Sequence, residues 1–174
     1  NVNATLTTFA TTTFGTGFNF INHGSLFVNS SADNQFIFNT GLIENTGTFT
    51  TRFGSLNNTG IILNNNTFVV QSTGDVTNTG SITNFDTINN YANILNNGSI
   101  NTVGTGSVFN NNGTVVNNNN FTHANNGGSQ FGFHNGLGAT FINNDIFVGN
   151  PGHSFTNNGI FVNNKTVLIQ AFTN

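Results

Sequence analysis

Ionisable side chains are the residues that could carry acid–base chemistry, and this chain has few of them. Only 4 % of its 174 residues are charged. The cations are Arg52 and Lys165, and the carboxylates are Asp33, Glu44, Asp75, Asp86 and Asp145. Catalysis requires acids, bases or nucleophiles that are placed together, and no two carboxylates lie at a recognised motif spacing. The sequence leaves carboxylate pairs between successive turns open, but we expect no catalytic residues and no enzyme.

Four histidines are the remaining candidates for site chemistry: His23, His123, His134 and His153. The last three are separated by eleven and nineteen residues, so stacked turns could bring them together as a metal site. Polar turn or surface histidines are the more common outcome. Cysteines are absent, and so is the regular Asp of calcium-binding repeats. We therefore predict no metal and no cofactor.

Charge and hydropathy restrict the partners. The net charge is −3 and no basic patch exists, so binding to nucleic acid is not expected. No run of about 18 apolar residues predicts a transmembrane helix. The chain begins at Asn1 and contains no Met, which we interpret as a mature chain after removal of a signal peptide, with an excised fragment as the alternative. The expected location is secreted, extracellular or at the cell surface.

A short motif recurs along the chain: Asn, then Thr, His or Asn, then Gly. Its spacing averages about 19 residues, which fits one coil of a solenoid. We therefore predict an all-β, single-domain parallel β-helix (β-solenoid) of about eight to nine coils. A degenerate copy is His134-Asn135-Gly136, where we expect a local irregularity. The repeat-turn glycines are Gly24, Gly41, Gly60, Gly80, Gly98, Gly113 and Gly159.

Apolar residues keep fixed, even offsets from this motif, four residues before and two residues after each Gly. Even offsets place side chains on one face of a strand, and the period disfavours helix. An antiparallel sandwich remains the alternative. The Asn of the motif lies two residues before the Gly and therefore shares the even offset of the apolar residues. It either points inward and forms a ladder with the Asn of neighbouring coils, or it faces solvent in a turn. The predicted inward column is Leu26, Ile43, Ile62, Ile82, Ile100, Val115 and Phe161.

The two ends of the chain differ from the middle. We assign residues 1–23 to an N-terminal coil, cap or assembly arm, and residues 24–174 to the solenoid repeats. The C-terminal coil is strongly apolar, with no polar cap of the kind that solenoids commonly carry. Because open strand edges template further pairing, we expect copies of this chain to associate. The predicted assembly residues are Phe9, Phe14, Phe18, Val167, Ile169 and Phe172.

The segments Leu56–Ile62 and Ile94–Ile100 resemble the repeats of filamentous-haemagglutinin-like adhesins. The resemblance runs from Phe20 to the last residue. It implies a right-handed parallel β-helix secreted to a bacterial surface. We expect an extracellular structural protein that self-assembles head to tail into a surface filament or matrix fibre. The alternative is an adhesin fragment that binds surface glycans, for which Tyr91 and Phe121 are candidate aromatic contacts.

Overall fold

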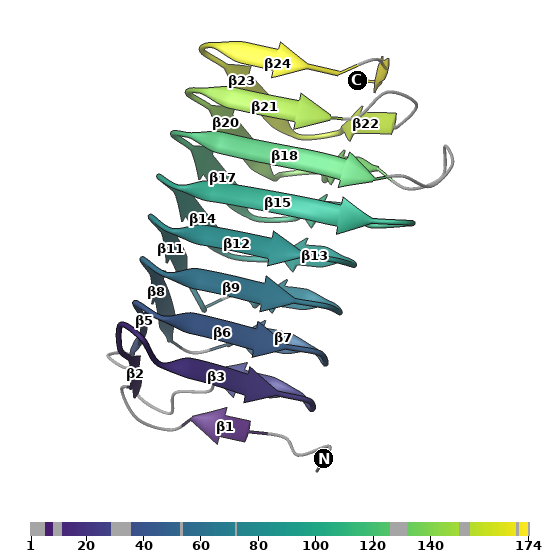
Figure 1. The fold of residues 1–174 in the computed structure, drawn as a ribbon. Helices are drawn as coiled ribbons and strands as arrows, with labels where there is room; N and C mark the ends of the chain where they lie inside the picture. Colours follow the sequence, from purple (N-terminus) through teal and green to yellow (C-terminus); the bar gives the residue numbers. More distant parts are fainter. Residues whose placement is uncertain are drawn as a thin grey trace.

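The computed structural model describes residues 6–8, 12–28, 36–52, 54–71, 73–125, 132–149, 154–169 and 171–173. Within these ranges the chain forms 25 short strands, all in parallel pairs, which wind into a stack of turns (Figure 1). No helix in these ranges is long and apolar enough to cross a membrane. The predicted all-β parallel β-solenoid is confirmed, and the antiparallel sandwich is excluded.

The chain passes through three sheets in turn, so that every third strand belongs to the same sheet. Sheet A contains β1 (Leu6–Thr8), β4 (Leu26–Val28), β7 (Phe49–Thr51), β10 (Phe68–Val70), β13 (Ile88–Asn90), β16 (Phe109–Asn111), β19 (Phe133–Asn135), β22 (Ser154–Asn157) and β25 (Ala171–Thr173). Sheet B contains β2 (Thr12–Phe14), β5 (Phe36–Asn39), β8 (Ser55–Asn58), β11 (Val76–Asn78), β14 (Asn93–Asn96), β17 (Thr114–Asn117), β20 (Thr140–Asn143) and β23 (Ile160–Asn163). Sheet C contains β3 (Asn19–Asn22), β6 (Leu42–Asn45), β9 (Ile61–Asn64), β12 (Ser81–Asn84), β15 (Ser99–Gly104), β18 (Asn120–Asn125), β21 (Ile146–Gly149) and β24 (Thr166–Leu168).

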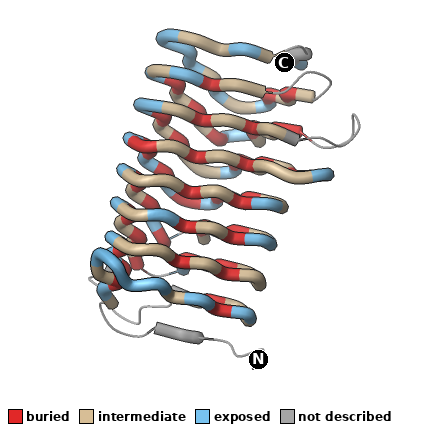
Figure 2. Tube along the Cα trace, in the orientation of Figure 1, coloured by how far each residue is buried: buried red, intermediate tan, exposed pale blue. Residues whose placement is uncertain are grey.

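Alternation along most strands separates a buried face from an outer face, which Figure 2 shows as regularly spaced buried positions on the turns below the last one. Each sheet lines the interior with one column of stacked apolar side chains, and aromatic rings dominate the C-terminal turns. Phe133, for example, stacks on Phe109 and Phe155 with ring centroids 4.9 and 4.8 Å apart. Such ring pairs add about 0.5–1.5 kcal/mol each beyond the burial of their surface.

Two features of the predicted repeat were wrong. A turn takes about 21 residues, not about 19. The predicted inward residues are indeed interior, but they form three columns, because Leu26 lies in sheet A, Val115 in sheet B and Ile82 in sheet C. The glycine motif also does not stay at the same bend of every turn, and this makes the average spacing between motif glycines shorter than one turn.

The structure places the motif glycines at bends between strands, but at three different corners. Gly24 lies at the C–A corner, between sheets C and A. Gly41, Gly60, Gly80 and Gly98 lie at the B–C corner, and Gly113 and Gly159 at the A–B corner. Along the chain, the motif therefore shifts twice to the preceding corner: from C–A to B–C after Gly24, and from B–C to A–B after Gly98. The expected irregularity near Gly136 takes the form of a longer A–B corner, in which Gly138 has a φ of 78°.

Close backbone stacking, not positive φ, explains the glycines of the B–C corner. A Cβ built on Gly80 would lie well under 3.0 Å from the carbonyl oxygen of Gly60 in the preceding turn. Gly98 stands in the same relation to the carbonyl oxygen of Gly80. None of these glycines has a positive φ. In these turns the requirement is therefore room between backbones, because a side chain at Gly80 or Gly98 would push the two stacked backbones apart.

Replacing Gly80 with Ala should lower the free energy of unfolding by about 1–3 kcal/mol, the usual cost of overpacking. Thermal or urea denaturation followed by circular dichroism measures this loss. Gly15→Ala is the matched control, because a Cβ there meets no atom within 4 Å and the φ of Gly15 is not positive. Equal losses in the two variants would show that the stacking of the corners does not demand glycine.

Candidate assembly surfaces and asparagine ladders

Asparagine side chains at the ends of strands point into the solenoid and bind one another along its axis. The longest ladder follows the B–C corner, where each Nδ2 donates to the Oδ1 of the next turn over 2.7–2.8 Å. Its members are Asn39, Asn58, Asn78, Asn96, Asn117, Asn143 and Asn163. Of the two roles that the sequence left open for these residues, the inward ladder is confirmed.

Two shorter ladders follow the other corners, each in one half of the molecule. At the C–A corner, Asn22, Asn45, Asn64 and Asn84 are linked over 2.6 Å. At the A–B corner, Asn90, Asn111, Asn135 and Asn157 are linked over 2.8 Å. Before Asn90, the A–B column has Thr51 and Val70 in place of Asn, and after Asn84 the C–A column continues with Thr102 and His123.

An amide suits these positions because it can donate and accept at once without carrying charge. Asn96 shows the full pattern: its Nδ2 donates to Asn117 Oδ1 at 2.7 Å and to the Asn120 carbonyl at 2.9 Å, while its Oδ1 accepts from Asn78. A charged residue in the same column would stack on its own copies about 4.8 Å away and repel them. This explains why the ladder positions hold amides and not charged residues.

The ladder also sets the length of the corner. After Asn78 and after Asn84, the next inward apolar residue follows four positions later, at Ile82 and Ile88. Where the column residue is not Asn, the corner is longer: Phe109 is seven residues after Thr102, and Phe133 is ten after His123. Asn135 is an exception, with Phe141 six residues later. The amide thus holds a compact corner by bonding the backbone of its own turn and the next.

The last described turn forms the C-terminal face of the solenoid. Strands β23, β24 and β25 are the last in their sheets, and no described strand pairs with their outer edges. Phe161, Val167 and Ile169 pack against the core there but are only partly buried. Phe172 pairs in register with Phe155. The predicted assembly residues Val167 and Ile169 therefore belong to the last described layer of the interior, and Leu168 between them faces outward and is 59 % exposed.

The last ladder amide is also at this end. Asn163 is exposed, and its Oδ1 accepts from Asn143 while its Nδ2 donates to the Lys165 carbonyl at 3.2 Å. Amides in the middle of the ladder also donate to the next turn, and no described turn lies beyond Asn163. A further turn stacked here would restore that bond.

The N-terminal end contains the first strand of each sheet, β1, β2 and β3, within residues 1–23. Phe14 is buried and lies against Phe20, with ring centroids 4.8 Å apart. Phe18, in the loop before β3, is 53 % exposed and stacks on Phe14 over 6.1 Å. Phe9 lies outside the described residues. A role for this segment as cap or arm stays a prediction.

The ionisable residues are spread over different corners and faces. Glu44 faces outward on β6, and Asp75 accepts a hydrogen bond from Asn93 Nδ2 at 3.0 Å. The Asp145 carboxylate pairs with the Lys165 ammonium, one turn further on, at the exposed B–C corner. The described residues contain no group of three His, Asp or Glu that could hold a metal. Burial lowers the pKa of His134, which lies on the outer side of β19.

The two aromatic residues considered for glycan contact have different surroundings. Tyr91 is 48 % exposed at the A–B corner, whereas Phe121 is fully buried among other phenylalanines. The prediction that Phe121 is a surface contact was therefore wrong, because its side chain points into the solenoid. Glycan binding stays a prediction.

Comparison with known proteins finds no match among family models, curated proteins or solved structures. The resemblance to filamentous-haemagglutinin-like repeats is confirmed as far as the parallel β-solenoid architecture. Membership of that adhesin family stays a prediction.

Proposed function

We propose that this protein is an extracellular structural subunit whose copies assemble end to end into a filament or matrix fibre. The C-terminal face of the described turns carries the proposal. It combines three strand edges, with which no described strand pairs, and partly buried apolar side chains that continue the interior columns. Strand edges of this kind accept a further strand by backbone hydrogen bonding.

A second copy of the chain fits the chemistry of this face. All three sheets run in one direction from the N-terminal to the C-terminal end, so the first strands of one copy can extend the last strands of another in parallel. Contact between two different ends repeats without closing and produces an open filament. Burial of Phe161, Val167 and Ile169 in the joint would remove apolar surface from water.

The scattered carboxylates and the near absence of charge support a structural role over a catalytic one. A joint formed by apolar side chains, backbone groups and amides has little charge for salt to screen. Assembly should therefore change little between low and high ionic strength.

Replacing both Val167 and Ile169 with Lys should abolish assembly, because two ammonium groups would have to be desolvated inside the joint. Sedimentation velocity over a hundredfold range of concentration measures the mass of the unmodified chain and of the variant. We expect large, concentration-dependent species for the former and monomers for the latter. Circular dichroism checks that the turns below the last one remain folded.

The control places the same charge on the same strand. Leu168→Lys adds an ammonium to the outer face of β24, so it should leave assembly intact. If Leu168→Lys disrupts assembly as much as the double variant does, the contact is lateral and the end-to-end proposal is wrong. A monomeric unmodified chain at every concentration would also contradict it.

A further inference from the structure

We propose that Asn112 is a site of spontaneous deamidation in the folded chain, while the stacked turns protect the Asn–Gly bonds at Asn97 and Asn135. In this reaction the backbone nitrogen of a glycine attacks the side-chain amide of the asparagine before it. The inference concerns the single chain, so it goes beyond the function proposed above and does not depend on assembly.

The reaction is easiest where glycine follows asparagine, because glycine has no side chain to hinder the approach of its nitrogen. The Gly113 nitrogen gives its proton to a base in the solvent and bonds to Asn112 Cγ. The Cγ–Nδ2 bond breaks, the amide nitrogen takes a proton from solvent and leaves as ammonia, and a cyclic succinimide remains. Water then opens the ring at either carbonyl, which leaves aspartate or isoaspartate. The net change replaces a neutral amide with a carboxylate.

The reacting nitrogen at Asn112 is only weakly held. Asn112 is exposed at the A–B corner between β16 and β17. The Gly113 N–H donates to the Oδ1 of the ladder residue Asn111 at 3.3 Å, which is beyond the usual range of about 2.7–3.2 Å for such a bond. That oxygen also accepts from Asn90 Nδ2 at 2.8 Å, which is the shorter of its two bonds. Release of the Gly113 N–H therefore costs little.

The side-chain amide of Asn112 can turn toward this nitrogen. Among the described residues, none forms a hydrogen bond with the Asn112 side chain. Its Oδ1 lies against Gly136 in the next turn, where a Cβ built on that glycine would be 2.5 Å away. Because Gly136 has no side chain, rotation of the Asn112 amide breaks no side-chain contact there.

The bond between Asn97 and Gly98 at the B–C corner is held by both neighbouring turns. The Gly98 N–H donates to the Asn78 carbonyl of the preceding turn at 3.0 Å. From the next turn, Asn118 Nδ2 donates to Asn97 Oδ1 at 2.8 Å, and Asn119 Nδ2 donates to the Asn97 carbonyl at 3.2 Å. Asn97 is exposed, as Asn112 is. Hydrogen bonding, not exposure, therefore distinguishes the two sites.

Asn135 is protected by burial as well as by hydrogen bonds. It is a ladder residue with no exposed surface, and its Nδ2 donates to Asn157 Oδ1 at 2.8 Å. The Gly136 N–H donates to the Asn111 carbonyl at 2.8 Å. Both reacting groups are therefore fixed, and succinimide formation at Asn135 must wait until the turn opens.

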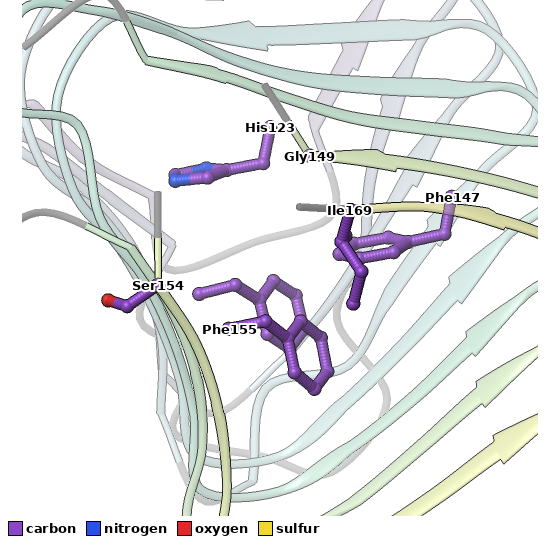
Figure 3. Close-up of a pocket in the computed structure, with 7 residues that line it drawn as sticks. His123, Phe147, Gly149, Ser154, Phe155 and Ile169 are labelled. Carbon is purple, nitrogen blue, oxygen red and sulfur yellow. The ribbon is translucent and has the colours of Figure 1, made fainter. Parts of the chain in front are cut away.

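The water that opens the ring is available at the outer corners. A small cavity does lie inside the C-terminal turns, where His123, Phe147, Phe155 and Ile169 line it and Ser154 lies at its edge (Figure 3). No Asn–Gly bond of the described residues borders this cavity. Hydrolysis is therefore expected at exposed bends such as that of Asn112.

Deamidation would alter the A–B corner in two ways. Both products carry a carboxylate at this bend, and isoaspartate also adds a CH₂ group to the backbone. The ladder residue Asn111 comes directly before, and it bonds Asn90 below and Asn135 above. A longer backbone at this bend would displace the Asn111 amide from these partners. The reaction at Asn112 thus changes the spacing of a ladder from outside.

Mass spectrometry of the dilute chain, kept at mildly alkaline pH with and without denaturing urea, tests the proposal. Chymotryptic peptides separate the three sites, and fragmentation locates each residue that has exchanged NH₂ for OH. In the folded chain, Asn112 should react at least about tenfold faster than Asn97 or Asn135, because their hydrogen bonds must first be released. In urea the three sites should react at similar rates, since glycine follows each of them.

Asn118→Ala is the matched variant, because it removes the donor to Asn97 Oδ1 and leaves the A–B corner unchanged. It should raise the rate at Asn97 by about two- to tenfold, the net contribution of one hydrogen bond, and leave the rate at Asn112 as it was. If Asn118→Ala folds and the rate at Asn97 does not rise, protection by hydrogen bonding is wrong. The unmodified chain decides without any variant: equal rates at Asn97 and Asn112 in the folded state, or an Asn112 that reacts only in urea, would overturn the inference.

Discussion

Replacing Ile82 with Asp should cost about 3–5 kcal/mol of folding free energy, which is the usual cost of an uncompensated buried charge. Ile82 is 1 % exposed in the middle of the solenoid and stacks between Ile62 and Ile100 of the neighbouring turns. No cation lies in this column, so the carboxylate must stay unpaired or bind a proton. Urea denaturation followed by circular dichroism measures the loss.

Thr83→Asp is the control for Ile82→Asp. Thr83 is the next residue on the same strand, but it faces outward between Leu63 and Asn101. A carboxylate there stays hydrated, and surface substitutions of this kind usually change stability by about 0.5 kcal/mol or less. Similar losses of stability in the two variants would mean that the assignment of Ile82 to the inner face and Thr83 to the outer face of β12 is wrong.

Replacing Asn96 with Leu should have the second large effect. The change breaks the longest ladder in its middle and leaves the buried Asn117 Oδ1 and the Asn120 carbonyl without this donor. Asn78 Nδ2 loses one acceptor but keeps the Ser99 carbonyl at 2.9 Å. Each buried polar group left unsatisfied costs about 1–3 kcal/mol. We therefore expect a total loss of about 2–6 kcal/mol in the free energy of unfolding, again from urea denaturation.

Asn97 offers the comparison for Asn96. It is exposed at the same corner, and its side-chain Oδ1 accepts a hydrogen bond from Asn118 Nδ2 at 2.8 Å. Water can replace Asn97 as the partner of that amide, so Asn97→Leu should cost little. If the two variants lose equal stability, the inward ladder at Asn96 contributes no more than the exposed hydrogen bond between Asn118 and Asn97.

Much of this architecture could be predicted from the chain because the interior follows a simple period. From Val76 to Ile100, an inward apolar residue occurs every sixth position, with an inward Asn two positions after each one as far as Asn96. Three such units make one turn, and even offsets within a unit point to one face. The strand phase and the burial of the apolar residues follow from this pattern. The asparagines share the parity of the apolar residues, but parity alone left open whether they form an inward ladder or a solvent-facing turn.

The length of the turn could not be predicted because glycine marks only some of the corners. At the B–C corner, Asn119 and Asp145 take the place that Gly80 and Gly98 hold in earlier turns. The spacing between successive motif glycines therefore mixes full turns with intervals that are one corner shorter than a full turn. The six-residue unit of apolar residue and Asn is the better signal, because it reports the interior and not the outer bend.

The interior role of His123 also lay beyond the sequence pattern. Thr102 and His123 replace Asn in the C–A column, where the corners lengthen, so no copy of the motif marks them. Only the register of the strands shows that the imidazole lies in a column of amides. The same holds for the last turn, since the partial exposure of Val167 and Ile169 depends on which strands lie above them.

Electron microscopy of the purified 174-residue chain at increasing concentration tests end-to-end assembly most directly. One copy should be a rod roughly 40 Å long, from turns stacked about 4.8 Å apart. We expect fibres one solenoid wide, many times longer than one copy, whose length grows with concentration and whose width does not. Discrete rods of a single length at every concentration, or ribbons that widen by lateral contact, would contradict the account.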